Sequence, residues 1–553
     1  MNHKKGFKRV LTLALTLVMA LSLAFVPKYS YAAEFKADVR SIANIPNDLS
    51  GKTIILHTND VHGAVEGYAQ ASALKYEFIA RGAEVILADA GDYSQGTPYV
   101  STTKGADAVT LMNYAGYDIA TLGNHEFDFG YEQLQKNLSK AMYKTICADV
   151  LDKNGNPIVD PNYEYTTASG VKIGFFGMAT PETQTKVNPA NIKGITFLSK
   201  TELYPCAQQQ IDALKADGCD IIVCLSHLGV DEESAPDGHR SVDLYANTTG
   251  IDIILDGHSH TVMTSGLNGE PVQSTGTKFA NIGMVVIDNA TKKIESNYLI
   301  KVDDGIINAP IVESVAQSIT DRVDTEYGVE FAQSEVDLNG QKDPGVRTQE
   351  TNLGDLIADA LKWSVLKEGG LKVKDDHVIA ITNGGGIRAS ISAGSVTKKD
   401  LNTVLPFGNT VAVVYINGEE LLEALEASTY STPGAVGGFP QVSGIKFTIN
   451  TSIPFAQGEA YPASTYYKPA SINRVTIESV NGKPFSLTDK YAVVTNDFCA
   501  AGGDTYYVFG NASENFDTGI VMDEAVMDYV QTKLGGKITS KDYGTVDGNI
   551  IIK

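Results

Sequence analysis

The chain has 553 residues, of which 43% are hydrophobic and 20% are charged, a composition typical of globular proteins. Its length predicts two large domains or three smaller ones, each able to bury its own core. Acidic residues outnumber basic ones by 66 to 44, which gives a formal net charge of −22 and argues against binding of a nucleic acid polymer. A small anionic ligand remains compatible with this charge, because a metal site can reverse the field locally.

Residues 1–32 have the features of a secretory signal peptide. Four basic residues precede an apolar run at 10–26, and Ser30-Tyr31-Ala32 supplies a cleavage site of the small-x-small type. An uncleaved membrane anchor is the alternative interpretation. No later run reaches the roughly 18 apolar residues of a transmembrane helix. The sequence therefore predicts export to the extracellular or cell-envelope space, with no membrane span after cleavage.

From residue 53 to about 300, short apolar runs alternate with helical stretches. The runs are rich in β-branched residues and are typical of strands that are buried on both faces. They lie at 53–56, 84–87, 118–122, 171–176, 220–225 and 251–255. Their alternation with helices predicts a layered α/β domain over 50–305. A further segment at 277–286 favours mixed rather than purely parallel sheets.

The segment 306–335 is predicted to be an interdomain helix followed by a linker, because Val312, Val315, Ile319 and Val323 recur at helical spacing. The remainder, 336–553, predicts an α+β domain. Helical patterns at 352–366 and 419–427 are interleaved there with strand-like runs. Those runs lie at 411–416, 474–477 and 491–495. The predicted fold class is thus α/β with mixed sheets, followed by α+β.

Five cysteines are few for an exported protein, and their odd number does not suggest a disulfide framework. Cys219 and Cys224 lie in or beside the apolar run at 220–225, which favours buried free thiols.

Histidine, aspartate and asparagine side chains follow five of the predicted strands, at the carboxyl ends where ligands of open α/β sheets gather. Any one of these strings alone is typical of a capped turn or a core histidine, but five in order are not. Seven of these side chains are candidate metal ligands: Asp60, His62, Asp92, Asn124, His227, His258 and His260. Imidazole, carboxylate and amide donors without thiolate suit Zn, Mn, Fe or Co. The set is too large for one ion and sufficient for two, an arrangement that promotes phosphoryl displacement.

The order Asp-x-His, Gly-Asp, Gly-Asn-His-Glu, His and Gly-His-x-His resembles that of the calcineurin-like metallophosphoesterases. Features of the second half narrow the resemblance to the 5′-nucleotidase family, over about 50–550 of the chain. That family has a dimetal N-terminal domain and a substrate-binding C-terminal domain. The resemblance implies two divalent metal ions, zinc, manganese or similar.

The resemblance also implies a role for each motif residue. One ion is held by Asp60, His62 and His260, although the last position varies within the family. The other ion is held by Asn124, His227 and His258, and Asp92 bridges the two. His125 and Asp128 resemble the catalytic dyad of the family. In that dyad the histidine stabilises charge on the transferring phosphoryl group and the aspartate orients it.

The second half carries the residues that resemble a nucleotide site. The glycine-rich stretch Asn383-Gly384-Gly385-Gly386-Ile387-Arg388 is by itself typical of a turn, and Arg347 alone is compatible with a solvated surface. By the resemblance, Asn383, Arg388 and Arg347 correspond to family residues that contact the substrate. Phe407 and Phe498 match two rings that stack on the base, and Asp504 matches a ribose ligand. Core packing is the alternative for each ring, and Asn409 completes the set of candidate substrate-binding residues.

These observations predict an exported, metal-dependent 5′-nucleotidase that releases phosphate from nucleoside 5′-phosphates for extracellular salvage. Activity on di- and triphosphates or UDP-sugars, base preference and oligomeric state stay open. The first alternative is a 2′,3′-cyclic-nucleotide 2′-phosphodiesterase/3′-nucleotidase, a branch that tends to use tyrosine in the sandwich. The second is a non-catalytic exported nucleotide-binding protein, which the intact ligands and the His125/Asp128 pair disfavour.

Overall fold

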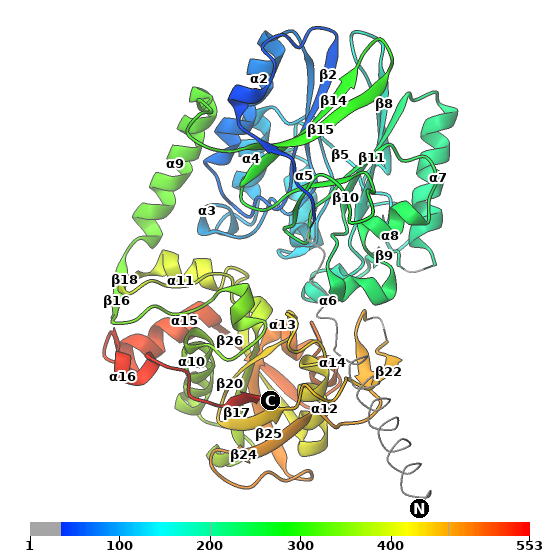
Figure 1. Cartoon of the computed structure of the whole chain (residues 1–553). Coiled ribbons are helices and arrows are strands. Elements are labelled where there is room, and N and C mark those ends of the chain that lie inside the picture. The colour runs from blue at the N-terminus through cyan, green and yellow to red at the C-terminus, as the bar shows by residue number, and fades with distance from the viewer. Residues whose placement is uncertain (1–34, 200, 463) are drawn as a thin grey trace, which may run out of the picture.

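The computed structural model describes residues 35–199, 201–462 and 464–553, arranged as two bodies joined along helix α9 (Pro310–Tyr327) (Figure 1). The predicted signal peptide lies outside the described residues. Among those that are described, no helix has both the length and the apolar character needed to cross a bilayer. The predicted fold class, α/β with mixed sheets followed by α+β, is confirmed.

The first body contains two mixed sheets rather than one. The seven-stranded sheet runs in the order β1 (Val39–Arg40), β15 (Lys293–Lys301), β14 (Asn281–Asp288), β2 (Lys52–Thr58), β3 (Glu84–Asp89), β4 (Ile119–Ala120) and β5 (Lys144–Thr145). The six-stranded sheet runs in the order β12 (Val262–Met263), β13 (Val272–Thr275), β11 (Ile253–Leu255), β10 (Ile221–His227), β8 (Lys172–Ala179) and β7 (Asn162–Thr166). Strands β2 to β5 are parallel in the first sheet, as are β8, β10, β11 and β13 in the second. The strands predicted from apolar runs are all present.

The two sheets pack face to face, which explains why their strands are apolar on both faces. Ile55 and Val285 from the first sheet share a buried cluster with Phe175 and Val223 from the second. Helices α2 (Gly67–Ala80), α4 (Ala106–Ala115) and α9 cover the other face of the first sheet, and α7 (Leu203–Ala216) and α8 (Ser241–Ala246) cover that of the second. Each fully buried side chain of this size contributes about 1.5–3 kcal/mol. The packing fixes both sheets so that their carboxyl ends meet.

The predicted interdomain segment 306–335 contains α9 and strand β16 (Glu330–Ser334). Helix α9 buries Val312, Ala316 and Ile319 against the first body. Strand β16 instead pairs with β18 (Gly394–Thr397) and β27 (Lys537–Ile538) of the second body. The chain therefore crosses between the bodies near residue 328. Domain limits at 50–305, 306–335 and 336–553 stay our proposal.

The second body is built on a five-stranded sheet between two helical layers. Its order is β20 (Pro440–Ser443), β17 (Val378–Asn383), β25 (Lys490–Asn496), β19 (Thr410–Asn417) and β26 (Asn515–Val521). Helix α10 (Asn352–Glu368) packs on one face and α12 (Gly418–Ser428) on the other. Helix α10 begins where the Thr351 hydroxyl accepts a hydrogen bond from the Gly354 amide, and it ends at Gly369, whose φ is +73°. The predicted run at 474–477 belongs to β24 (Val475–Val480), in a separate three-stranded sheet.

All five cysteines are free, as predicted. Cys224 is buried, but Cys219 is only half-buried because it lies just outside the strand, before β10.

A buried acidic group lies on α10 at Asp355, which is 1% exposed. Its carboxyl accepts a hydrogen bond from the Asp547 amide, and the nearby Glu350 carboxylate accepts from the amides of Asn549 and Ile550. Burial, reinforced by the charges of Glu350 and Asp547, raises the pKa of Asp355 to about 9. A raised carboxyl pKa favours the folded state at low pH, and this contribution is lost as pH rises from the unfolded value near 4 to about 9.

We expect Asp355→Asn, which stays neutral at every pH, to remove this dependence. Between pH 6 and 9 the wild-type free energy of unfolding should fall more steeply than that of the variant, by about 1 kcal/mol per pH unit. Chemical denaturation at four pH values measures both slopes. Equal slopes would contradict the assignment of a protonated Asp355.

Candidate metal centre

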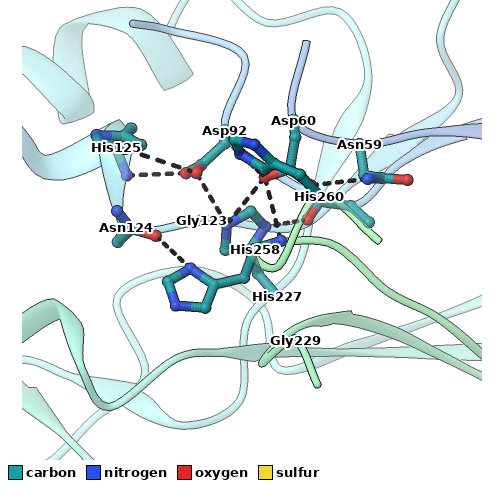
Figure 2. A network of polar contacts seen from close by, with 12 residues as sticks. Asn59, Asp60, Asp92, Gly123, Asn124, His125, His227, Gly229, His258 and His260 are labelled. Carbon is teal, nitrogen blue, oxygen red and sulfur yellow. Dashed lines mark hydrogen bonds and ion pairs between the residues drawn. The ribbon is translucent and has the colours of Figure 1, made fainter. Parts of the chain in front are cut away.

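The loops after five strands bring the seven predicted ligands together, and Figure 2 labels all of them except His62. Three strands come from the first sheet and two from the second. Asp60 and His62 follow β2, Asp92 follows β3, Asn124 follows β4, His227 ends β10, and His258 and His260 follow β11. The predicted convergence is thus observed, but at a junction of two sheets rather than at the edge of one.

Backbone strain is concentrated in these loops. Five predicted ligands have a positive φ, between 45° and 71°. These are Asp60, His62, Asp92, His258 and His260. A left-handed conformation costs a non-glycine residue of order 1–3 kcal/mol, so the surrounding contacts must impose it. The Asp60 amide donates to the Gly91 carbonyl at 3.0 Å, and the His62 amide donates to the Asp92 carbonyl at 3.1 Å.

Two motif glycines are explained by the closeness of the ligands. A Cβ on Gly123 would lie 2.2 Å from Oδ1 of Asp92. A Cβ on Gly257 would lie 2.7 Å from Nδ1 of His227 and 3.0 Å from Oδ2 of Asp60. Any larger residue would therefore push a ligand out of place.

The first predicted ligand group, Asp60, His62 and His260, has the geometry of a cation site. Nε2 of His62 lies 3.0 Å from Nε2 of His260, and these atoms lie 3.8 Å and 3.5 Å from Oδ1 of Asp60. Burial holds the pKa of both histidines well below its ordinary value. Both imidazoles are therefore neutral, which is the form that binds metals.

The second group is centred on His227 and Asp92. Nδ1 of His227 donates to the Ala90 carbonyl at 2.6 Å, so its Nε2 faces Oδ2 of Asp92 at 3.0 Å. Although burial lowers the pKa of His227, the carboxylates of Asp92 and Asp60 raise it to about 10. Nε2 of His227 and Oδ2 of Asp92 thus face each other where a divalent ion would suit both. Oδ1 of Asn124 lies 2.9 Å from Nδ1 of His258, and Asp92 is close to both groups, 3.8 Å from Nε2 of His62.

His125 and Asp128 form the predicted pair. Nδ1 of His125 donates to Oδ2 of Asp128 at 2.6 Å, and Nε2 lies 3.9 Å from Oδ2 of Asp92. Although burial lowers the pKa of His125, the carboxylates of Asp128 and Asp92 raise it overall. The His125 imidazole can therefore carry a positive charge beside the predicted metal ligands.

Every predicted substrate-binding residue lines one cavity of about 1020 Å³ between the two bodies. Those residues are Arg347, Asn383, Arg388, Phe407, Asn409, Phe498 and Asp504. The same cavity is lined by His125, Asp128 and five of the predicted metal ligands. Asp60 and His227 do not line it and are fully buried. One cavity thus joins the predicted metal centre to the predicted substrate residues.

The two arginines have no ion pair with any carboxylate in the described part of the chain. Burial and the neighbouring charge of Arg347 lower the pKa of Arg388 to about 10. Two guanidinium groups that line one cavity without a direct ion pair in the described residues are typical of an anion site.

The aromatic and polar residues of the second body differ in their packing. Phe407 is half-buried, and its ring stacks on His125 with centroids 5.7 Å apart. Phe498 belongs to a buried core cluster, so core packing, the alternative role considered for each ring, applies to it in part. Nδ2 of Asn383 donates to Oδ2 of Asp504 at 2.7 Å, and Nδ2 of Asn409 donates to Asp497.

Three buried residues that support the ligands were not predicted. The Glu126 carboxylate accepts hydrogen bonds from the amides of Asp92, Tyr93, Ser94 and Gly123, at 2.7–3.1 Å. Asn59 donates to Oδ2 of Asp60 at 2.7 Å, and Glu182 contacts His258. Glu126 ends the Gly-Asn-His-Glu motif, so its position was visible in the sequence. Glu182 had no such signal.

A short segment of the first body also touches the substrate side of the cavity, which the sequence did not indicate. The Asp504 amide donates to the Thr185 carbonyl at 2.8 Å, and Nζ of Lys186 lies 3.9 Å from Oδ1 of Asp504. Asn188 donates to Asp497 at 2.9 Å.

Comparisons with known proteins agree with this geometry. Residues 53–262 match the family model for calcineurin-like phosphoesterases, and 330–511 match that for the 5′-nucleotidase C-terminal domain. The trifunctional nucleotide phosphoesterase protein YfkN of Bacillus subtilis is 29% identical over 93% of this chain, which spans only 36% of that protein. A 5′-nucleotidase of Diplobatis ommata is 28% identical over 90% of this chain and 89% of its own length. The crystal structure of a 5′-nucleotidase precursor from Thermus thermophilus matches with a TM-score of 0.75 and 28% identity, over 91% of this chain and 99% of that one. The resemblance drawn from the motifs is confirmed.

We expect Glu126→Gln to loosen the centre, because an amide group cannot accept from all of these backbone donors. Leaving one or two of them unsatisfied should cost about 1–3 kcal/mol of stability. Thermal unfolding with and without Mn²⁺ should show a lower melting temperature and a smaller rise on adding metal. Glu132→Gln, at a side chain that is 84% exposed, is the control. A Glu126 variant that matched this control would contradict the supporting role.

Proposed function

We propose that this chain, which belongs to the 5′-nucleotidase family of calcineurin-like phosphoesterases, hydrolyses nucleoside 5′-phosphates to nucleosides and phosphate. The observation that carries the proposal is that one cavity is lined both by five of the seven predicted metal ligands and by all the predicted nucleotide residues. A nucleotide with its phosphate at the ligands and its base toward Phe407 and Phe498 uses both walls of this cavity.

Two divalent ions are proposed at the ligand groups, one at Asp60, His62 and His260 and the other at Asn124, His227 and His258. Asp92 lies between them. Such ions supply Lewis acidity to the phosphoryl oxygens and lower the pKa of a water nucleophile. Nitrogen and oxygen donors suit zinc or manganese, and we leave the choice between them to measurement.

The protein side chains then hold and neutralise the substrate. Asp128 fixes the His125 ring so that Nε2 faces the cavity, where its N–H donates to a phosphoryl oxygen as charge develops. Arg347 and Arg388 line the cavity without a direct ion pair in the described residues, and they offer positive charge to the phosphate. Asp504, held by Asn383, is positioned to accept from the ribose hydroxyls. Phe407 and Phe498 offer ring faces that tolerate every base.

Export and nucleotide salvage are part of the same proposal. They rest on the signal-peptide pattern of residues 1–32, which predicts a mature protein outside the cytoplasm. Broader activity is the second candidate, because the relative YfkN is named as a trifunctional nucleotide phosphoesterase.

The reaction is tested by phosphate release from residues 33–553 with 5′-AMP, 3′-AMP, 2′,3′-cyclic AMP, ATP and UDP-glucose. We expect fast cleavage of 5′-AMP with Mn²⁺ and none with EDTA, because the metal ions supply the Lewis acidity that the protein side chains lack. Preference for the cyclic or 3′ substrate would keep the metal assignment and overturn the proposed substrate. Nucleotide binding without turnover in a metal-loaded sample would support a binding protein instead.

We expect His125→Ala to lower kcat for 5′-AMP by about 100- to 10,000-fold, because it removes a charged donor to the phosphoryl group. Steady-state kinetics at saturating Mn²⁺ measures the loss. His377→Ala, on the short helix Asp375–His377 that does not line the cavity, is the matched control and should keep full activity. Near-normal turnover by the His125 variant would contradict the proposed catalytic role of His125.

A further inference from the structure

Glu182 is a buried carboxylate that no part of the proposed mechanism uses. It immediately precedes helix α6 (Thr183–Lys186) and is only 4% exposed, yet it lines the cavity beside the metal ligands. Oε2 lies 3.3 Å from Nε2 of His258, and Oε1 accepts a hydrogen bond from the Ser234 hydroxyl. Both carboxylate oxygens therefore have a defined donor.

This contact fixes which nitrogen of His258 carries the proton. A carboxylate only accepts hydrogen bonds, so Nε2 of His258 is the donor, and in the neutral imidazole Nδ1 then keeps its lone pair. Nδ1 lies 2.9 Å from Oδ1 of Asn124, which is also an acceptor. Two acceptors this close do not bond to each other, but together they suit a shared cation.

We propose that Glu182 is a positioning residue that holds His258 by Nε2–H and so presents Nδ1 to the second metal ion. Carboxylates that accept from a metal-ligating histidine fix its tautomer and ring orientation. The inference rests on the dimetal centre of the proposed function, but not on the identity of the substrate.

The place of Glu182 in the fold extends this role. At the other end of α6, the Thr185 carbonyl accepts from the Asp504 amide at 2.8 Å, and Nζ of Lys186 lies 2.8 Å from the Tyr466 hydroxyl. One short helix thus contacts a proposed metal ligand at one end and the proposed ribose site at the other. The second body anchors α6, and this anchoring holds Glu182 against His258.

The test is calorimetric titration of residues 33–553 with Mn²⁺ in the absence of nucleotide. We expect the wild type to bind two ions. Glu182→Gln should bind one ion with unchanged affinity, at Asp60, His62 and His260, and the other about 10–100-fold more weakly. Glu202→Gln, at an exposed residue just before α7, is the matched control and should bind like the wild type.

Ser234→Ala provides a second variant, because it removes the donor to Oε1 and leaves the His258 contact in place. It should weaken the same ion by a smaller factor, which keeps the proposal testable if Glu182→Gln folds poorly. Wild-type affinity for both ions in the variants would overturn the proposal, and so would equal weakening of both. Because no nucleotide is present, failure to cleave 5′-AMP would count against the proposed function and leave this result unaffected.

Discussion

Two buried carboxylates and four imidazoles, of which His258 and His260 are half-buried, lie close enough together to suit a shared cation. Asp60 and Asp92 are 0% and 2% exposed, and His227 is fully buried between them. Desolvated charges of this kind are tolerated only when they are paired. The strained loops, the motif glycines and the carboxylate of Glu126 all hold these donors where mutual repulsion would otherwise separate them. The nitrogen and oxygen donors gathered at this centre therefore suit divalent cations.

The architecture serves this requirement with two sheets. A single parallel edge would place the strand ends in a row, whereas two packed sheets bring loops from opposite sides around one point. The second body then closes the remaining side with Arg347 and Arg388. The chain has a formal net charge of −22, so under the proposed function the two arginines of this cavity, and not the surface at large, bind the anion.

Much of this arrangement was predictable, because short stretches of sequence determine it. An apolar run followed by Asp-x-His or Gly-His-x-His marks a strand and the ligand loop after it, and both are observed at β2 and β11. The pairing of strands into two sheets was not predictable, since face-to-face packing leaves the same apolar pattern as helix covering. Glu182 and Lys186 were missed for a related reason. Their partners, His258 and Asp504, lie far away in the chain, and no periodicity or spacing connects them.

The division of the cavity between two bodies has a consequence for how such a chain changes over generations. Under the proposed function, the residues assigned to the base belong to the second body and the metal ligands belong to the first, so ligand preference can change without disturbing the ion sites. Helix α6 is the exception, since it is encoded with the first body but contacts Asp504 and Tyr466 of the second. An exchange of C-terminal halves between relatives would therefore have to carry this four-residue helix along, or select compensating substitutions within it.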